Sequence, residues 1–302
     1  RLARCILNYR SAKKQMEQAE TILKAIATDG RIHARFEPTG TNTGRFSSKK
    51  PNLQNIGRGK LRGCFVPDEG NRLVVADYSQ VELRVAAVVA NEERMIEAYK
   101  SGVDLHRQTA SLVLDKPIED ITKDDRQLAK AVNFGLLYGQ SAKGLVAYAK
   151  KAYGVEMEYE RARDIRGRFF SAYTGLREWH KTARKMAAES TQSVRTVSGR
   201  VQWLPEGKEA KWPRFTSLLN TPVQGGSADA LKQAMVDLSD KLPHAASIVS
   251  TVHDELIVEC ASGTAEEVKA LVETAMLDAV QTMFPGVRFE VEAGVCESWA
   301  EK

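Results

Sequence analysis

The spacing of apolar residues along the first half of the chain predicts helices with one short strand among them. Residues 1–28 place apolar side chains at three- and four-residue steps, which predicts a helix that Asp29-Gly30 ends. The apolar run at 73–76 is short and predicts a buried strand. The spacing of apolar residues also predicts a helix at 81–97, directly after that strand, and a block rich in helices at 104–190.

The second half of the chain predicts strands and helices in alternation. The predicted elements are a hairpin over 193–205 with Ser198-Gly199 in its turn, helices over 228–242 and 265–284, two strands within 247–260, and a strand over 287–293. No repeat of 20–50 residues is found. The pattern indicates the α+β class, with helices inserted between strands that share one sheet.

Composition excludes several classes of protein. With 302 residues, 43% hydrophobic and 27% charged, the chain falls in the ordinary globular range and not among disordered or collagen-like sequences. The longest apolar run, 85–90, is too short for a membrane span. The four cysteines lie far apart without metal-ligand spacing, which favours a reducing compartment and no structural zinc.

Charge is distributed unevenly along the sequence. Residues 1–64 carry 14 Lys and Arg against 4 Asp and Glu, a net +10, whereas residues 240–302 carry 4 against 12, a net −8. One interpretation is that the basic part holds a polyanion and the acidic part binds polyvalent cations. The other is a solvated helix beside a charged loop, and charge alone does not separate the two.

Two aspartates are candidates for metal binding. Asp77 follows the predicted strand at 73–76, and Asp254 with Glu255 interrupts an apolar stretch, which is costly unless the acids sit in a hairpin turn or pair with cations. If the strands are neighbours, Asp77 and Asp254 meet at one sheet edge. Carboxylates placed in this way can hold two divalent metals for phosphoryl transfer. The alternative is that residues 253–255 form a simple polar turn.

A second candidate is a stripe of side chains along one helix. Arg126, Lys130, Phe134 and Tyr138 are spaced four residues apart, so that they lie within about 120° of one helix face. Two cations followed by two aromatic rings suit a nucleotide, whose phosphates lie at one end and whose sugar and base lie at the other. The alternative is an amphipathic helix whose aromatic residues face the core.

Three segments resemble motifs A, B and C of the family A, DNA polymerase I-like, DNA polymerases. They are Asp77–Arg84 (DYSQVELR), Arg126–Gly139 (RQLAKAVNFGLLYG) and His253–Glu255 (HDE). Further matches in the family's order are found at 43–48 (TGRFSS), 51–56 (PNLQNI), 104–107 (DLHR) and 220–229 (NTPVQGGSAD). The resemblance covers nearly the whole chain and identifies it as a member of that family.

The resemblance implies an α+β fold of the polymerase right-hand type, with an antiparallel palm sheet, a helical fingers insertion and a remnant of the thumb. The implied parts are the end of the thumb at 1–40, the palm at 41–100 and 216–302, and the fingers at 101–215. The implied activity is template-directed DNA synthesis, which adds deoxynucleotides to a primer 3′-hydroxyl and releases pyrophosphate. On this basis the chain is expected to be a fragment or one part of a split polymerase.

The same resemblance assigns roles in catalysis and metal binding. Asp77 and Asp254 are implied to bind two Mg²⁺ ions, with Mn²⁺ as an alternative, and the main-chain carbonyl of Tyr78 is implied to be a further ligand. Lys130 is implied to contact the triphosphate and to protonate pyrophosphate. Glu255 is implied to be a less essential accessory acid.

The remaining implied contacts concern the substrates. Glu82 is implied to exclude ribonucleotides by a clash with the 2′-hydroxyl, while bonded to Tyr138. Residues implied to bind the incoming nucleotide are Arg126, Phe134, Tyr138, Glu82, His106 and Gln80. Residues implied to contact DNA are Arg45, Asn220, Gln224 and His253. The expected partners are primer-template DNA, dNTPs and a separate chain bearing a thumb or exonuclease, with no membrane, and the expected location is the cytoplasm of a bacterial or phage-infected cell.

Three other functions compete with DNA synthesis. A single-subunit RNA polymerase shares the palm, but Glu82, Phe134 and the HDE sequence argue against it. A catalytically silent DNA-binding subunit would be favoured by loss of either palm aspartate, and both are present. A metal-dependent nuclease also uses paired aspartates, but the cationic and aromatic stripe fits a nucleoside triphosphate better.

Overall fold

The computed structural model describes residues 2–57, 59–204 and 214–302, and its contacts divide the chain into two units. Unit 1 comprises residues 1–77, 235–275 and 291–302, and unit 2 comprises 78–234 and 276–290. The first residue of the predicted helix at 1–28 and the last residue of the predicted hairpin at 193–205 lie outside the described residues. The two units are considered separately below.

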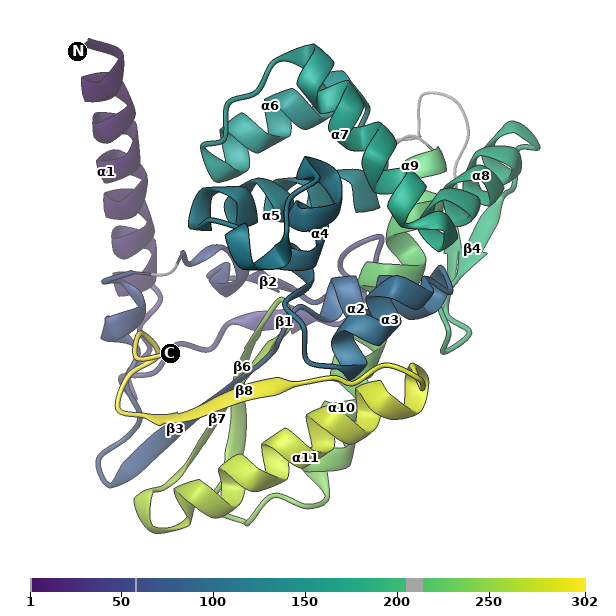
Figure 1. Cartoon of the computed structure of the whole chain (residues 1–302). Coiled ribbons are helices and arrows are strands. Elements are labelled where there is room, and N and C mark those ends of the chain that lie inside the picture. The colour runs from purple at the N-terminus through teal and green to yellow at the C-terminus, as the bar shows by residue number, and fades with distance from the viewer. Residues whose placement is uncertain (1, 58, 205–213) are drawn as a thin grey trace. The chain divides into compact units, whose positions relative to one another are not determined.

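A four-stranded sheet of order β6-β7-β3-β8 is the centre of unit 1 (Figure 1). Its strands are β3 (Asn71–Tyr78), β6 (Ser247–Val252), β7 (Glu255–Ala261) and β8 (Val291–Cys296). β7 is antiparallel to both β3 and β6. β3 lies between two strands, which explains why its central run Val74-Val75-Ala76 is fully buried and continuously apolar. The expected shared sheet, made of strands far apart in sequence, is confirmed.

Apolar residues from all parts of unit 1 form its core. Two short strands, β1 (Arg35–Glu37) and β2 (Ser47–Lys49), pair in an antiparallel ribbon. The buried core residues are Ile22, Leu53, Ile56, Leu73, Val75, Val252, Ile257, Cys296 and Trp299. This cluster anchors the segment before β3 against the sheet through Leu53 and Ile56.

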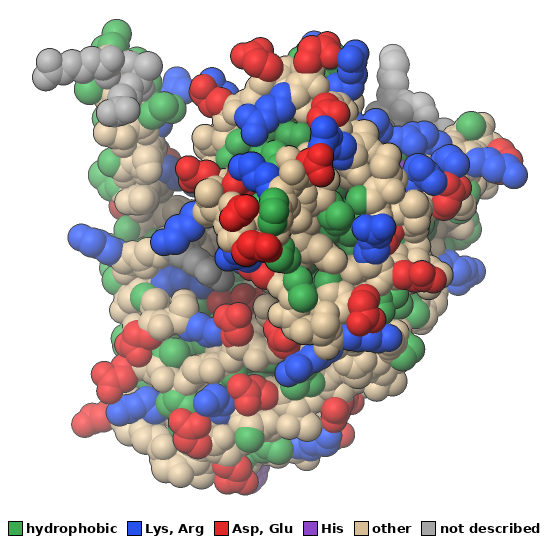
Figure 2. Space-filling model, viewed as in Figure 1, with side chains coloured by type: hydrophobic (Ala, Val, Ile, Leu, Met, Phe, Trp, Pro, Cys, Tyr) green, Lys and Arg blue, Asp and Glu red, His purple; other side chains and the backbone are tan. Residues whose placement is uncertain are grey.

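The N-terminal helix α1 (Leu2–Leu23) is shorter than the predicted 1–28. Residues after Leu23 leave the helix because Ile26 and Ile32 form a β-bridge around the turn at Gly30, whose φ is 79°. Much of the apolar side of α1 is exposed, as the green side chains in Figure 2 show. Its exposed large apolar residues are Leu2, Ile6, Leu7, Tyr9, Met16 and Leu23.

Unit 2 is predominantly helical, as predicted for residues 104–190. Its helices are α2 (Val81–Val89), α3 (Glu93–Lys100), α4 (Leu105–Leu114), α5 (Lys123–Leu137), α6 (Ala142–Tyr153), α7 (Tyr159–Ala172), α8 (Thr174–Ala188) and α9 (Arg214–Asn220). The predicted hairpin is confirmed as β4 (Ser193–Arg195) paired with β5 (Val201–Trp203). Two helices, α10 (Gly226–Ser239) and α11 (Ala265–Met283), contain residues of both units. Lys and Arg side chains are mixed with Asp and Glu on the face of unit 2 seen in Figure 2.

The single helix predicted at 81–97 is wrong, because the chain breaks between α2 and α3. Asn91 has a φ of 47°, and the buried Glu92 caps α3 by accepting a hydrogen bond from the Arg94 amide. Glu92 also accepts hydrogen bonds from the amides of Gly175 and Leu176. A Cβ at residue 175 would lie 2.8 Å from the Ala90 carbonyl oxygen, so this contact requires glycine.

The last strand begins later than the predicted range of 287–293. β8 starts at Val291, although Val287 and Phe289 are buried as an alternating pattern requires. Alternation reports which side chains are buried, but it does not require the backbone to join a sheet ladder.

Among the described residues, no helix combines the length and apolarity needed to cross a bilayer.

Candidate active site

The two candidate metal ligands are held by neighbouring strands of unit 1. Asp77, near the end of β3, is the direct partner of Glu255 at the start of β7. Val252 also pairs with Glu255, which leaves His253 and Asp254 as the two-residue turn between β6 and β7. The strands are therefore neighbours, as the metal-binding interpretation requires, and Asp254 is one residue from the partner of Asp77.

The turn that carries Asp254 is fixed from the side by Gln54. The Gln54 amide accepts a hydrogen bond from the His253 backbone amide at 3.1 Å and donates one to the Thr251 carbonyl at 2.6 Å. His253 has a φ of 57°, and burial, followed by the charge of Arg45, lowers its pKa. The position of this turn is therefore set by a residue about 200 positions earlier in the sequence.

Arg45 is the cationic partner of Asp254. Its Nη2 lies 3.3 Å from each carboxylate oxygen of Asp254, and each side chain is 20% exposed. The long distances and partial exposure describe a loose ion pair. The carboxylate of Asp254 is thus partly accessible, and Arg45 places a positive charge beside it.

Glu255 is bound differently from the two aspartates. It is 5% exposed, both of its oxygens lie 3.2 Å from Arg62 Nη1, and Trp299 Nε1 donates to it at 2.7 Å. The Arg62 guanidinium also stacks over the Trp299 ring at 4.1 Å. These contacts engage both oxygens of Glu255 and hold its side chain within the fold.

Carboxylate oxygens are the ligands that magnesium prefers, and Mg²⁺ is commonly held by one or two carboxylates plus substrate phosphates. Asp77 and Asp254 supply that number. Among the described residues, no group of three or more His, Cys, Asp or Glu could hold a metal by itself. The Tyr78 hydroxyl donates to the Met276 carbonyl at 2.7 Å, so of Tyr78 only the main chain could be a ligand. This donor set fits a metal that also binds a phosphate ligand.

The stripe on α5 faces away from the core of unit 2. Arg126, Lys130, Phe134 and Tyr138 are each partly exposed, whereas nearly all residues between them from 128 to 137 are buried. The alternative in which the aromatic residues face the core is therefore wrong. Tyr138 lies just past the last helical residue, Leu137, so the stripe continues from the helix into the turn at Gly139.

The cationic end of the stripe is positioned by Asp104. This residue caps α4 through the amides of His106 and Arg107, and its second carboxylate oxygen accepts a hydrogen bond from Arg126 Nε at 2.7 Å. Burial raises the pKa of Asp104, but the hydrogen bonds from Arg126 and Arg107 outweigh it and the pKa is lowered. Asp104 therefore stays ionised and orients the Arg126 guanidinium.

His106 lies beside the stripe and is 2% exposed. Its ring centroid is 6.1 Å from that of Phe134. Burial, together with the charges of Arg126 and Lys130, lowers the pKa of His106 to about 4 against the weaker opposing effect of Asp104. At neutral pH the imidazole is therefore uncharged.

Glu82 and Tyr138 form the hydrogen bond that the sequence resemblance implied. The Tyr138 hydroxyl donates to Glu82 Oε2. Glu82 comes from the first turn of α2 and Tyr138 from the end of α5, so the bond ties two helices of unit 2 together. The carboxylate of Glu82 is thereby fixed in one orientation.

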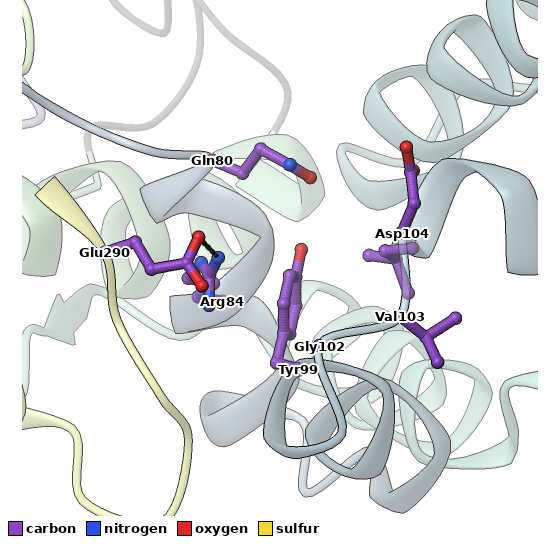
Figure 3. A pocket seen from close by; sticks show the side chains of 8 residues that line it. Gln80, Arg84, Tyr99, Gly102, Val103, Asp104 and Glu290 are labelled. Carbon is purple, nitrogen blue, oxygen red and sulfur yellow. Dashed lines mark hydrogen bonds and ion pairs between the residues drawn. The ribbon is translucent and has the colours of Figure 1, made fainter. Parts of the chain in front are cut away.

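Gln80 lines a pocket of about 150 Å³ with Arg84, Tyr99, Gly102, Val103, Asp104, Leu105 and Glu290. Figure 3 shows the Gln80 amide and the Tyr99 hydroxyl pointing into this space, with Arg84 paired to Glu290 at its side. Gln80 Oε1 and the Tyr99 hydroxyl are buried and have no hydrogen-bond partner among the described residues. The pocket is polar and adjoins Asp104, so Gln80 lies near the residue that orients Arg126.

Two of the implied DNA contacts, Asn220 and Gln224, lie in unit 2 around an irregular turn. Asn220 ends α9, and Gln224 lies in the π-helical turn η5 (Thr221–Gly225) before α10. The Asn220 Oδ1 atom is buried without a partner among the described residues. π-helical turns are rare and often accompany functional sites. The other two implied contacts, Arg45 and His253, lie in unit 1 beside Asp254.

Several residues that build these sites were not found from the sequence. Gln54, Arg62 and Trp299 position the turn and Glu255. Gln54 and Arg62 lie in the short 3-10 helices η1 (Leu53–Asn55) and η2 (Arg62–Cys64), and elements of one turn have no periodic pattern. Asp104 had a signal, since an aspartate directly before a predicted helix is a typical cap. Asn133, whose Nδ2 lies 2.9 Å from His106 Nδ1, had a weaker signal, since it is a polar residue on the buried side of a helix.

Comparison with known proteins supports one family. The model of DNA polymerase family A matches residues 1–301. The chain is 42% identical over 299 residues to DNA polymerase I of Aquifex aeolicus, covering 98% of this chain and 50% of that protein. It is 37% identical to DNA polymerase I of Pseudomonas aeruginosa, covering 99% of this chain and 33% of that one. The chain therefore spans half or less of the length of these relatives.

A solved structure gives the same answer for the fold. The POL domain of Pol1 from M. smegmatis, in complex with DNA primer-template and dNTP, matches with a TM-score of 0.86 and 34% sequence identity. The match covers 97% of this chain and 52% of that one. The predicted α+β polymerase fold is confirmed by this similarity. The family match over residues 1–301, together with Asp77 on β3, Asp254 in the adjoining turn and the partly exposed stripe of α5, shows that this chain belongs to DNA polymerase family A.

Proposed function

We propose that the chain catalyses template-directed DNA synthesis, in which the primer 3′-hydroxyl attacks a deoxynucleoside triphosphate and pyrophosphate leaves. The observation that carries this proposal is the register of β3 and β7, which pairs Asp77 with Glu255, the residue directly after Asp254. Residues 41–100 and 216–302 act as the palm in this proposal, 101–215 as the fingers and 1–40 as the end of a thumb. The proposed location is the cytoplasm of a bacterial or phage-infected cell.

Divalent metal use is general in this family, and we propose two Mg²⁺ ions, or Mn²⁺ in their place, as the metals of this chain. Asp77, Asp254 and the main chain of Tyr78 would hold them. When bound, such ions lower the pKa of the attacking hydroxyl and stabilise charge on the phosphates. Arg45, at 3.3 Å from Asp254, keeps a positive charge beside the carboxylate in the absence of metal.

The nucleotide is proposed to bind to unit 2. Arg126 and Lys130 supply positive charge for the triphosphate, His106 supplies a hydrogen bond, and Lys130 is proposed to protonate the leaving pyrophosphate. Phe134 and Tyr138 continue the same stripe and are proposed to lie along the sugar and base. Glu82, oriented by Tyr138, is proposed to exclude a 2′-hydroxyl, which favours DNA synthesis over RNA synthesis.

Primer-template DNA is the proposed partner. Arg45 and Gln224 are proposed to read minor-groove acceptors at the primer terminus, Asn220 to contact the template and His253 to lie near the primer end. The basic residues of the N-terminal segment are proposed to contact the duplex backbone. A separate chain bearing a thumb or an exonuclease remains a proposed additional partner.

Primer extension with four dNTPs and Mg²⁺ tests the proposal. Asp77→Asn and Asp254→Asn are expected to abolish extension, because each removes a metal ligand and metals contribute several kcal/mol of transition-state stabilisation. Both variants should still bind primer-template DNA in a fluorescence anisotropy assay, since duplex affinity comes mainly from phosphate contacts. Asp240→Asn, an exposed residue of unit 1, is the matched control and should extend normally.

Other outcomes would select other functions. Near-normal extension by both aspartate variants would overturn the metal assignment. Metal-dependent shortening of the primer without extension would indicate a nuclease, and DNA binding without either reaction would indicate a silent binding subunit. Lys130→Ala is expected to weaken dNTP use far more than DNA binding, and equal losses would show that Lys130 is a DNA backbone contact.

A further inference from the structure

Four buried polar side chains of unit 2 form a continuous hydrogen-bonded chain that ends at His106. The Tyr173 hydroxyl lies 2.8 Å from Thr109 Oγ1, Thr109 Oγ1 lies 3.0 Å from Asn133 Oδ1, and Asn133 Nδ2 lies 2.9 Å from His106 Nδ1. Tyr173, Thr109 and Asn133 are 0% exposed and His106 is 2% exposed. Solvent therefore does not supply alternative partners to the buried members of this chain.

Tyr173 determines the direction of the hydrogen bonds. Burial raises the pKa of its phenol, which therefore keeps its proton. Thr109 Oγ1 is the hydrogen-bond partner found for this hydroxyl among the described residues. A buried donor left without an acceptor is costly, so the phenol donates to Thr109. Thr109 has a single hydroxyl hydrogen, and it is then directed to Asn133 Oδ1.

The orientation of the Asn133 amide follows from this direction. Because Oδ1 accepts from Thr109, the Nδ2 group is the one that faces His106, and it can only donate. The Nδ1 atom of His106 must then carry a lone pair. In a neutral imidazole the single ring proton consequently lies on Nε2.

We propose that Asn133 is a positioning residue that fixes His106 as the neutral tautomer protonated on Nε2, with Thr109 and Tyr173 setting the orientation of the Asn133 amide. The proposal rests on the proposed function, in which His106 contacts a phosphate of the nucleotide. Arg126 and Lys130 already provide two cations there. A neutral Nε2–H donor can bond a phosphate oxygen without adding a third positive charge that would repel them.

Nitrogen NMR of the full chain with ¹⁵N-labelled histidine tests the tautomer directly, because protonated and unprotonated ring nitrogens have well-separated shifts. At pH 7.5 the signals of His106, identified by their loss in His106→Gln, should show protonated Nε2 and unprotonated Nδ1. His180 is an internal reference, since its Nε2 lies 3.1 Å from the Leu137 carbonyl oxygen and must be protonated to donate. A wild-type His106 protonated on Nδ1 would overturn the proposal.

Two variants test whether the hydrogen bonds from Tyr173 to Asn133 set the tautomer of His106. In Asn133→Asp the carboxylate accepts from both Thr109 and His106, so Nδ1 should become protonated. In Tyr173→Phe the hydrogen that sets the direction is lost, and a share of His106 should move to the Nδ1–H form. Tyr99 is a buried tyrosine that is not part of these hydrogen bonds, so Tyr99→Phe is the matched control and should leave the His106 tautomer unchanged.

The outcomes separate this proposal from the proposed function. If Asn133→Asp does not fold, Tyr173→Phe decides, because it removes one oxygen and keeps the ring. An unchanged tautomer in every folded variant would overturn the positioning role. Primer extension is measured on the same wild-type sample. Absence of extension together with the expected tautomer would count against the proposed function and leave the tautomer assignment standing.

Discussion

Glu255 lies directly opposite Asp77 on the neighbouring strand, and its carboxylate is bound by Arg62. Directly opposed residues of antiparallel strands project their side chains from the same face of the sheet, where two negative charges repel. Arg62, 6% exposed, offsets the charge of Glu255 within the fold. Of the three acids, Glu255 is therefore paired with a cation inside the fold, whereas Asp77 and Asp254 are the ones proposed to bind metal.

Arg62→Met is expected to destabilise the protein by about 3–5 kcal/mol, because it leaves a buried carboxylate without its cation. The free energy of unfolding, measured in urea, checks this value. Arg72→Met removes the exposed pair between Arg72 and Glu297 at 3.2 Å and should cost no more than about 1 kcal/mol. The double variant Arg62→Met with Glu255→Gln should recover part of the loss, and equal effects of Arg62→Met and Arg72→Met would contradict a buried ion pair.

Glu82→Ala is expected to relax the exclusion of ribonucleotides, because it removes the carboxylate proposed to clash with the 2′-hydroxyl. The preference for dCTP over rCTP should fall by roughly 10- to 100-fold in single-nucleotide incorporation. Tyr138→Phe keeps the carboxylate but removes its hydrogen bond, so its effect should have the same direction and a smaller size. Glu119→Ala, exposed in unit 2, is the control. An unchanged preference for dCTP over rCTP in Glu82→Ala would falsify the proposal that Glu82 excludes ribonucleotides.

Phe134 is expected to make this protein discriminate against dideoxynucleotides. The resemblance to family A implies Phe or Tyr at this position, where a Tyr hydroxyl would replace the contact that a missing 3′-hydroxyl leaves empty. Without it, unpaired polar groups cost on the order of 1–3 kcal/mol. A chain-termination ladder at equal dNTP and ddNTP concentrations should therefore show little termination by the wild type and strong termination by Phe134→Tyr. Strong termination by the wild type would mean that residue 134 does not face the sugar.

Stability is expected to fall as the pH is lowered from about 6.5 to about 4, in part through His180. This residue is 1% exposed, and burial lowers its pKa from the ordinary histidine value of 6.5 to about 4. Between these pH values the unfolded chain binds a proton that the folded chain does not. The contribution of neutral His180 to the free energy of unfolding is therefore fully present above about pH 6.5 and is lost as the pH falls towards about 4. The loss is at most about 1.4 kcal/mol per pH unit for each buried histidine of this kind.

Urea unfolding of the wild type and of His180→Gln at pH 7.5, 6 and 5 measures this contribution. The variant should lose less stability over this range, although a slope should remain because burial lowers the pKa values of His106 and His253 as well. Identical slopes in the two proteins would show that His180 can be protonated without loss of the fold.

The sequence by itself determined the main elements and the candidate residues. Short apolar runs identified the strands β3, β6 and β7, and apolar residues spaced three or four positions apart identified most helices, because these patterns report which faces of an element are buried. The four-residue spacing placed Arg126, Lys130 and Phe134 on one face of α5. The motifs identified the family, since they occur in one order along almost the whole chain.

Tertiary structure decided which of these residues face each other. Arg62 meets Glu255 across 193 positions, and Arg45 meets Asp254 across 209. The basic N-terminal segment thus partly neutralises the acidic C-terminal one within unit 1, which net charges alone could not show. Three further features have the same origin. They are the partial exposure of the α5 stripe, the break between α2 and α3, and the donor-to-acceptor direction of the hydrogen bonds from Tyr173 to His106. Each depends on contacts between segments far apart in sequence, whereas local periodicity describes only one segment at a time.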